Sequence, residues 1–236
     1  ARIAKVDLSS RICNLDPNGI FLKRYHASLK ANLEKQYYCK PTSHHPLTLT
    51  FSVGGAGAQR NLGVQIAQGL REQIRRQEIV VNLVCGVRSD VADFFRRELR
   101  GAGFEKSLRR SLHVVHYSSR HDYFTKFPDL LRKTDILWTK PSEMSFYVGL
   151  GIPVIIAPPI GSQEEFNRLW LQQMGAGVDQ LDSRYAGEWL FDWIRSGALA
   201  RMAWNGYIEA PTHGALRIQE IVTGVAVKLE ELPFIV

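Results

Sequence analysis

Residues 134–177 constrain the fold of this chain more than any other stretch, because they repeat one pattern twice: an apolar run, a polar loop and a segment with helical spacing. The predicted strands are residues 135–138 and 153–157, and the predicted helices are residues 143–149 and 163–174. Pro158 and Pro159 place a loop after the second strand, because proline has no backbone N–H to donate. In a parallel α/β sheet both polar loops lie at the carboxyl ends of strands, the edge where such sheets bind ligands.

The alternation of strand and helix extends over residues 47–180. Further strands are expected at residues 47–53, 79–85 and 112–115, and helices at residues 62–74, 91–99 and 123–132. In the helix at 163–174, the apolar face is expected to consist of Phe166, Leu169, Trp170 and Met174. The pattern predicts an α/β fold: a Rossmann-like parallel sheet with helices on both faces and right-handed crossovers.

The sequence pattern divides the chain into three parts. Residues 1–46 carry a turn signal at 16–19 and a helical segment at 21–38, and we expect them to be a linker and helix between domains. Residues 47–182 form the Rossmann-like domain, and residues 183–236 add C-terminal helices that pack on it. The chain begins without a signal-peptide pattern and without methionine, which indicates a start cut from a longer protein.

The 236-residue chain has a net charge of +7, with its basic residues spread along the sequence. This distribution favours a solvated surface, and without interleaved aromatic residues it does not indicate nucleic-acid binding. Contact with the surface of an anionic membrane stays open. Cys13, Cys39 and Cys85 are widely spaced and belong to no metal-binding pattern, so we expect reduced thiols, no metal site and a cytoplasmic location.

A glycine-rich loop, residues 53–58, connects a predicted strand to a helix. Its members Gly54, Gly55, Ala56, Gly57 and Ala58 would let backbone N–H groups approach a phosphate, and the helix N-terminus adds partial positive charge. Arg60 could supply a further cation. The loop lacks the Gly-Lys-Ser/Thr of a Walker A sequence and is no full G-x-G-x-x-G. The alternative is a tight turn that binds nothing.

Four motifs together resemble the nucleotide-sugar-binding, C-terminal half of GT-B glycosyltransferases: T-K-P-S-E, G-I-P, G-x-Q-E-x-x-N and G-A-G. The MurG-type N-acetylglucosaminyltransferases and the monogalactosyldiacylglycerol synthases are the most similar groups, over roughly residues 48–177. The glycine loop resembles the G-G-S-x-G-A loop that approaches the donor diphosphate in MurG-type enzymes. This chain is one residue shorter there and has Ala56 in place of the serine, so only backbone contacts to phosphate are expected.

The resemblance also implies roles for polar residues that follow the strands. The expected donor-binding residues outside the glycine loop are Lys140, Ser142 and Glu143 near ribose and phosphate, Gln163 on the sugar, Asn167 packed against the glycine loop, and His116 near the base or phosphate. For Glu143 the alternative is a charge that favours the helix dipole, since the family loop is two residues longer. For His116 the alternative is a structural histidine.

The resemblance implies that the chain binds a nucleotide sugar as the donor half of a hexosyltransferase, and the expected donor is UDP-linked. No catalytic residue is assigned, because the base for the acceptor would come from a missing N-terminal acceptor-binding domain, and this chain alone would be inactive. The chain contains no D-x-D, so no metal and no further cofactor are expected. Two alternatives stay open: a nucleotide-sugar epimerase using Glu143 and His116, and a non-catalytic nucleotide-binding module, which the shortened loop favours.

Overall fold

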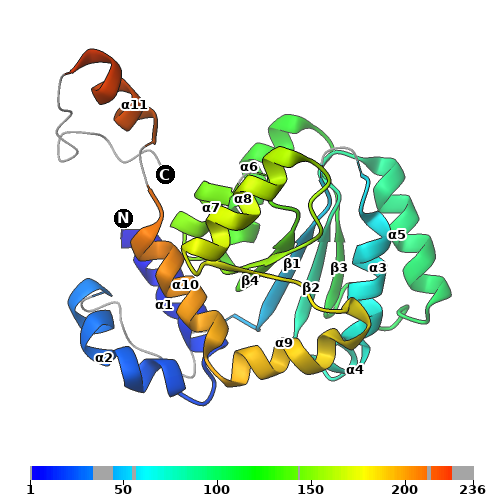
Figure 1. The fold of residues 1–236 in the computed structure, drawn as a ribbon. Coiled ribbons are helices and arrows are strands. Elements are labelled where there is room, and N and C mark those ends of the chain that lie inside the picture. The colour runs from blue at the N-terminus through cyan, green and yellow to red at the C-terminus, as the bar shows by residue number, and fades with distance from the viewer. Residues whose placement is uncertain (1, 34–44, 55–56, 143, 212–213, 225–236) are drawn as a thin grey trace.

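The computed structural model describes residues 2–33, 45–54, 57–142, 144–211 and 214–224. It contains one six-stranded, fully parallel sheet with the strand order β3-β2-β1-β4-β5-β6 (Figure 1). The strands are β1 (Thr48–Ser52), β2 (Val80–Val84), β3 (Leu112–Val115), β4 (Ile136–Thr139), β5 (Val154–Ile156) and β6 (Gly177–Asp179). The predicted Rossmann-like parallel sheet is confirmed.

The direction of strand addition reverses between β1 and β4. The chain adds β2 and β3 on one side of β1, and then crosses back to place β4 directly beside β1 on the other side. At such a switch point the loops after the two neighbouring strands diverge to opposite faces and leave a crevice that binds ligands in open α/β sheets. The fold therefore places the loops after β1 and β4 next to each other.

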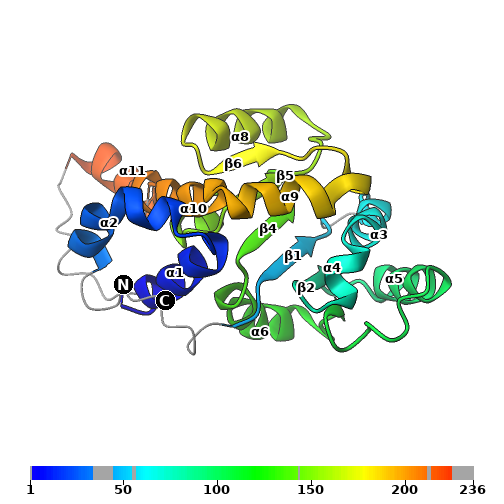
Figure 2. The same ribbon diagram turned by 90° about the horizontal axis from the view of Figure 1, so that it is seen from below.

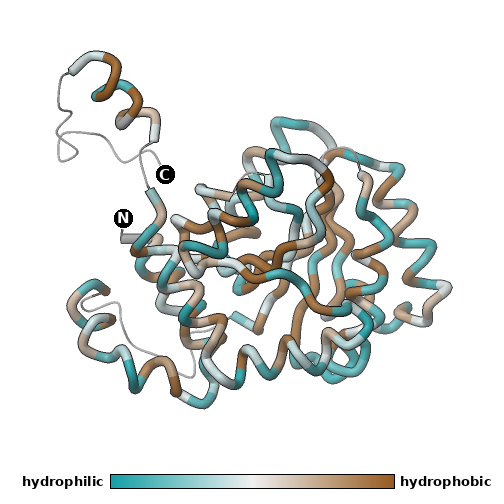
Figure 3. The backbone as a smooth tube through the Cα atoms, in the orientation of Figure 1, coloured by the Kyte–Doolittle hydropathy of each residue, from teal (hydrophilic) through white to brown (hydrophobic). Residues whose placement is uncertain are grey.

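Helices cover both faces of the sheet, because neighbouring residues of a buried strand point to opposite sides. Leu83 and Trp138 belong to a core with α3 (Arg60–Gly69), α5 (Ser89–Gly101) and α9 (Ala186–Arg195). Val84 is adjacent to Leu83 and Leu137 is adjacent to Trp138, and both pack on the other face with α6 (Arg120–Arg132). Residues of β5 pack similarly with α7 (Met144–Gly149) and α8 (Ser162–Gln173). Figure 2 shows the layers from below, and Figure 3 shows the hydrophobic strands between them.

The remaining helices flank this sandwich: α1 (Arg2–Leu15), α2 (Ile20–Leu33), α4 (Arg71–Arg75), the 3-10 helix η2 (Ser183–Tyr185), α10 (Ala198–Glu209) and α11 (Gly214–Thr223). The sequence pattern did not predict α1. This helix packs along α10, and its residues Leu8 and Ile12 are fully buried in the main core. The linker role of residues 1–46 stays a prediction.

Arg11 fixes α1 to the body of the protein. Its guanidinium is buried and donates to backbone carbonyl oxygens of Leu131, Thr134, Leu150 and Gly151, at 2.7–3.4 Å. These carbonyls lie in the last turn of α6 or just after the ends of α6 and α7, where helices leave unsatisfied acceptors. One side chain of α1 therefore caps two helices on the opposite face.

Two details of the predicted elements are wrong. Phe166 and Leu169 do not face the core: 72% and 44% of their surfaces are exposed, and Leu171 is the buried residue of α8. The strand β6 was not expected, because Gly177 and Asp179 interrupt the apolar pattern that identifies strands. Helix α8 packs chiefly through its carboxyl-terminal half, so its amino-terminal half projects apolar side chains into solvent.

The cysteines differ in state. Cys13 is disulfide-bonded, so the expectation of a reduced thiol is wrong at this position. Cys39 lies outside the described residues. Cys85 is a free, buried thiol, and burial raises its pKa to about 12, which makes it a poor nucleophile at neutral pH. The cytoplasmic location stays a prediction, and a disulfide is unusual in that compartment.

Among the helices in the described ranges, none combines the length and the apolar composition that a transmembrane span requires.

Candidate functional site

The loops after β1 and β4 meet at the carboxyl edge of the sheet. Ser52 and Thr139 are paired in the last rung between the two strands, so Gly54 and Lys140 leave the sheet side by side. The aliphatic part of Lys140 lies directly over Gly54: a Cβ atom at position 54 would be 2.3 Å from Cε of the lysine. A side chain larger than hydrogen at position 54 would therefore displace Lys140 from the glycine loop.

Glu164 holds the ammonium group of Lys140. Lys140 Nζ lies 2.5 Å from Glu164 Oε1, and the backbone N–H of Ile160 donates to Glu164 Oε2 at 2.8 Å. Burial opposes ionisation of this carboxyl, but the hydrogen bonds from Lys140 and Ile160 outweigh it and lower the pKa of Glu164. The carboxylate is ionised at neutral pH and neutralises the lysine that covers the glycine loop.

Two amides connect the other loops at this edge. Asn167 Nδ2 donates to the carbonyl oxygens of Pro141 and Ser142, both at 3.0 Å. Gln59 Nε2, just before α3, donates to Pro158 O at 2.8 Å. The loops after β1, β4 and β5 are thereby joined into one polar rim. Among the described residues, the hydrogen bonds of the Asn167 amide go to the loop after β4, whereas packing against the glycine loop was expected.

The described part of the glycine loop forms a tight turn. Gly57 has a φ of +70°, and its N–H already donates to Gly54 O at 2.7 Å. A Cβ at position 57 would lie 3.2 Å from Val91 Cγ2 of α5, so a side chain there is disfavoured both by conformation and by space. Ala58 is exposed. The amide of Gly57 is thus used within the turn, and Gly55 and Ala56 lie outside the described residues.

Arg60 contacts a neighbouring helix, and its role toward a phosphate stays a prediction. Its guanidinium carbon lies 4.6 Å from the ring centroid of Phe94, a cation–π contact that directs the side chain toward α5. Gln163 is exposed in the first turn of α8, beside the rim, and Ser142 is exposed in the loop after β4. His116 is half-buried after β3, two strands away from β1. Glu143 lies outside the described residues.

From the sequence, no role was assigned to Glu164, and its contact with Lys140 was missed. A signal for it exists. Gly161 is the N-cap of α8, so Glu164 occupies the third helical position, where a glutamate commonly reaches back to a backbone N–H before the helix. In the parts of the chain that the structure describes, no three His, Cys, Asp or Glu side chains gather closely enough to hold a metal ion.

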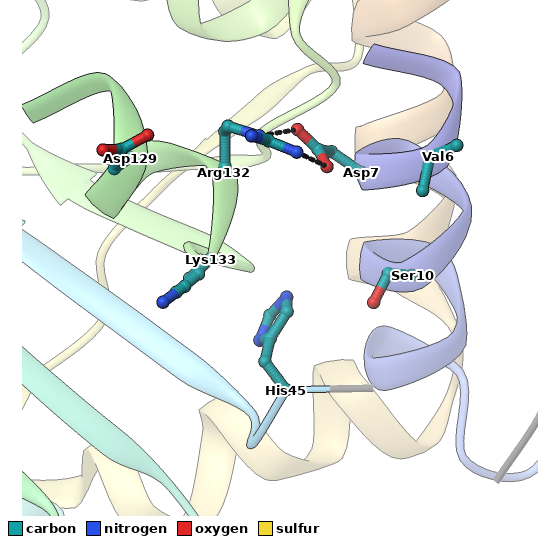
Figure 4. Close-up of a pocket in the computed structure, with 7 residues that line it drawn as sticks. All are labelled: Val6, Asp7, Ser10, His45, Asp129, Arg132 and Lys133. Carbon is teal, nitrogen blue, oxygen red and sulfur yellow. Dashed lines mark hydrogen bonds and ion pairs between the residues drawn. The ribbon is translucent and has the colours of Figure 1, made fainter. Parts of the chain in front are cut away.

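A cavity of about 420 Å³ lies at the opposite, amino edge of the sheet, between α1 and the end of α6 (Figure 4). Asp7 of α1 and Arg132 of α6 close one side with an ion pair of 2.9 Å, and the ring of His45 points into the space between the two helices. Behind His45, at 3.6 Å, is the fully buried carboxylate of Asp135. The cavity is lined by charges of both signs and lies beside α1, which indicates a region of structural contacts.

Asp135 is the most perturbed acid at this edge. Burial raises its pKa to about 8, against the lowering effects of Arg11, the Thr48 N–H and the Asn14 amide. Its Oδ2 accepts from Thr48 N at 2.8 Å and from Asn14 Nδ2 at 3.1 Å. It joins the start of β1 to α1, and it faces away from the polar rim at the carboxyl edge.

No protein-family model matches the chain, and no curated protein matches it. Its fold is similar to that of the glycotransferase of kitacinnamycin, with a TM-score of 0.50 and 14% identity over 79% of this chain and 45% of that chain. Weaker similarities connect it to a protein assigned as a UDP-N-acetylglucosamine 2-epimerase from Listeria monocytogenes and to the spinosyn rhamnosyltransferase SpnG. Their TM-scores are 0.48 and 0.44, at 13% and 12% identity over 79% and 75% of this chain and 50% and 46% of those chains.

The chain spans about half the length of each of these three structures. At these identities the likeness concerns the fold alone. What the chain shares with the first of these structures is a Rossmann-like architecture, a parallel sheet between layers of helices.

Proposed function

We propose that this chain is the donor-binding half of a GT-B glycosyltransferase and binds a nucleotide sugar, expected to be UDP-linked, at the carboxyl edge of β1 and β4. The observation that carries this proposal is the meeting of the glycine loop and Lys140 at the switch point of the sheet. The absence of a side chain at position 54 lets Lys140 lie directly over the glycine loop, so the two form one unit at the place where parallel α/β sheets bind ligands.

The proposed chemistry is stabilisation of the leaving nucleoside diphosphate without a metal. The turn before α3 presents the N-terminus of that helix, which favours negative charge. Lys140 would exchange its contact with Glu164 for one with the diphosphate, so the carboxylate acts as a placeholder for the ligand charge. Such a preformed cation stabilises the charge that develops on the leaving group. Gln163 would donate and accept at the sugar hydroxyls.

The acceptor and the catalytic base would belong to another part of a longer protein. Three phenylalanines near the carboxyl edge, Phe124 of α6, Phe146 of α7 and Phe166 of α8, have 58–73% of their surfaces exposed, which supports a covering domain on this side. Turnover by the complete protein with a sugar donor separates a transferase from an epimerase and from a non-catalytic module.

Titration calorimetry of the chain with UDP, GDP, ADP and NAD, with and without magnesium, tests the proposal. Saturable binding of UDP without magnesium is expected, weakened at least about tenfold in Lys140→Gln, because a charge-assisted contact to phosphate is lost. Lys23→Gln, which removes an exposed lysine of α2, serves as the matched control and should bind like the wild type. Equal affinity of Lys140→Gln and wild type, or no binding of any nucleotide at millimolar concentration, would reject the proposed site.

A further inference from the structure

A second hollow, of about 580 Å³, lies at the amino ends of β2 and β3, on the edge of the sheet opposite the polar rim. It is enclosed by the turn between α4 and β2 and by the loop that precedes β3. The side chains that matter for its chemistry are Arg75, Gln77, Glu105, Lys106, Ser107 and Arg110. Its volume falls in the range of small-molecule sites.

The hollow is rich in positive charge that the protein does not neutralise. Lys106 and Arg110 have no ion-pair partner among the described residues, and Arg75 has only a 3.5 Å contact with the exposed Glu72. The carboxylate in the lining, Glu105, lies 3.4 Å from Arg100 Nε and is thereby partly neutralised. The lining therefore has three cations and one carboxylate whose charge is partly neutralised by Arg100. This balance of charge favours an anionic ligand.

The largely buried residue Ser107 lines the same hollow, and its hydroxyl oxygen keeps some exposed surface. The residue is 92% buried, since its exposed fraction is 8%, and its hydroxyl has no hydrogen-bond partner among the described residues. The backbone around it is fixed, because its carbonyl oxygen accepts the N–H groups of Arg110, Ser111 and Leu112 at 3.0–3.2 Å. Ser111, by contrast, donates its hydroxyl to Ile74 O at 2.7 Å and is occupied. Ser107 thus presents a rigid, unused donor beside the cations.

The backbone around the hollow is also unusual. Within the described ranges, the two non-glycine residues with positive φ are Gln77, at 58°, and Arg109, at 72°. Gln77 lines the hollow, and Arg109 lies between Leu108 and the lining residue Arg110. Left-handed conformations cost non-glycine residues free energy and collect at ligand sites.

We infer that this hollow binds the phosphate group of an anionic ligand, held by Arg75, Lys106 and Arg110 with a hydrogen bond from Ser107. Guanidinium groups present planar pairs of donors that match phosphate oxygens, and the lysine adds a point charge. The inference does not depend on the proposed donor site, because the two sites lie at opposite ends of the strands.

NMR titration of the chain with inorganic phosphate, at constant ionic strength in chloride, tests the inference. Saturable shifts of the Ser107 and Arg110 amide resonances are expected, with the apparent Kd raised at least about tenfold in Lys106→Gln/Arg110→Gln. Ser107→Ala should weaken phosphate binding while leaving the charge unchanged. The matched control Lys23→Gln/Lys30→Gln removes two exposed lysines of α2 and should keep the wild-type affinity.

Two sources can supply this phosphate, and a second arm of the experiment separates them. Glycerol phosphate that competes with inorganic phosphate, without sedimentation of the chain on phosphatidylglycerol vesicles, assigns a free phosphorylated metabolite. Sedimentation on phosphatidylglycerol vesicles, but not on phosphatidylcholine vesicles, with loss in Lys106→Gln/Arg110→Gln, assigns a lipid headgroup. Non-saturable shifts, or equal weakening in the Lys23→Gln/Lys30→Gln control, would overturn the inference and leave a merely solvated basic surface.

Discussion

Gly63 lies where α3 packs closely against Phe95 of α5 and Phe51 of β1. A Cβ atom at this position would meet Phe95 at 2.7 Å and Phe51 at 3.0 Å. We expect Gly63→Ala to lower the free energy of unfolding by about 1–3 kcal/mol, because both rings are fixed in the core. Gly101→Ala is the control: its Cβ would meet nothing within 4 Å, so it should be neutral or slightly stabilising in urea denaturation.

Arg11 is a residue whose loss the core cannot absorb. Arg11→Met would retain much of the volume but leave backbone carbonyls after α6 and α7 without a donor. We expect a loss of about 3 kcal/mol or more in the free energy of unfolding, measured by urea denaturation. The exposed Arg201 of α10 provides the matched control Arg201→Met, which should change stability by less than about 0.5 kcal/mol. Similar losses in both variants would contradict the capping role.

Asp135 should make stability fall as the pH rises. Its pKa is about 8 in the folded protein and has an ordinary value of 3.8, so the folded state holds the proton more tightly. Its contribution is complete below about pH 4 and is lost as the pH rises through about 8. Between these limits one proton accounts for a slope of up to about 1.4 kcal/mol per pH unit.

Asp135→Asn removes this titration and should flatten the decline between pH 5 and pH 8, as followed by urea denaturation at several pH values. Asp129→Asn, a change to an exposed aspartate of α6, should keep the wild-type slope. The same slope in Asp135→Asn and the wild type would show that another group sets the pH dependence.

At the scale of elements, one side chain of α8 orders the loop that follows β4. Asn167→Ala removes both hydrogen bonds to Pro141 and Ser142. Hydrogen exchange followed by mass spectrometry should show faster exchange in residues 140–142 and α7, with little change in Tm, because the bonds lie near the surface. Gln172→Ala removes a 3.0 Å bond from the same helix to Asp179 and should leave that loop unchanged. Unaltered exchange in Asn167→Ala would contradict this role.

The sequence was sufficient for the elements that bury continuous apolar runs. The strands β1–β5 and the helices between them follow from periodicity, because each is recognisable without its neighbours. The helix α1 could not be predicted, because the buried Arg11 interrupts its apolar stripe. The burial of Arg11 is explained only by carbonyl acceptors more than 100 residues away. Short β6 was also hidden, because its pairing with β5 and not its composition makes it a strand.

The candidate site was predictable in position but not in contacts. The order of loops and strands placed Gly54 and Lys140 at one edge, since carboxyl ends of parallel strands share it. The partner of Lys140 could not be read from the pattern, because Glu164 reaches it across two loops. The direction of the Arg60 side chain could not be predicted either, because it depends on its contact with Phe94 of a neighbouring helix.

At the scale of the whole molecule, the sheet separates two polar regions. The rim with Lys140 lies at the carboxyl ends of the strands, and the hollow with Lys106 and Arg110 at the amino ends. We expect Lys106→Gln/Arg110→Gln to leave the calorimetric affinity for UDP within about twofold of the wild type, since exposed charges farther apart than a Debye length interact weakly. A larger change at physiological salt would contradict the independence of the two edges.

The contacts of Arg11 also give the chain a mechanical property. Its guanidinium connects α1 to the carbonyl of Thr134, two residues before β4, and to that of Gly151, three residues before β5. A displacement of α1 along its axis would therefore pull on the segments that lead into β4 and β5. The opposite ends of these strands carry Lys140 and the loop before α8. The amino-terminal helix is thereby anchored to the segments that lead into β4 and β5, the strands that end at the polar rim.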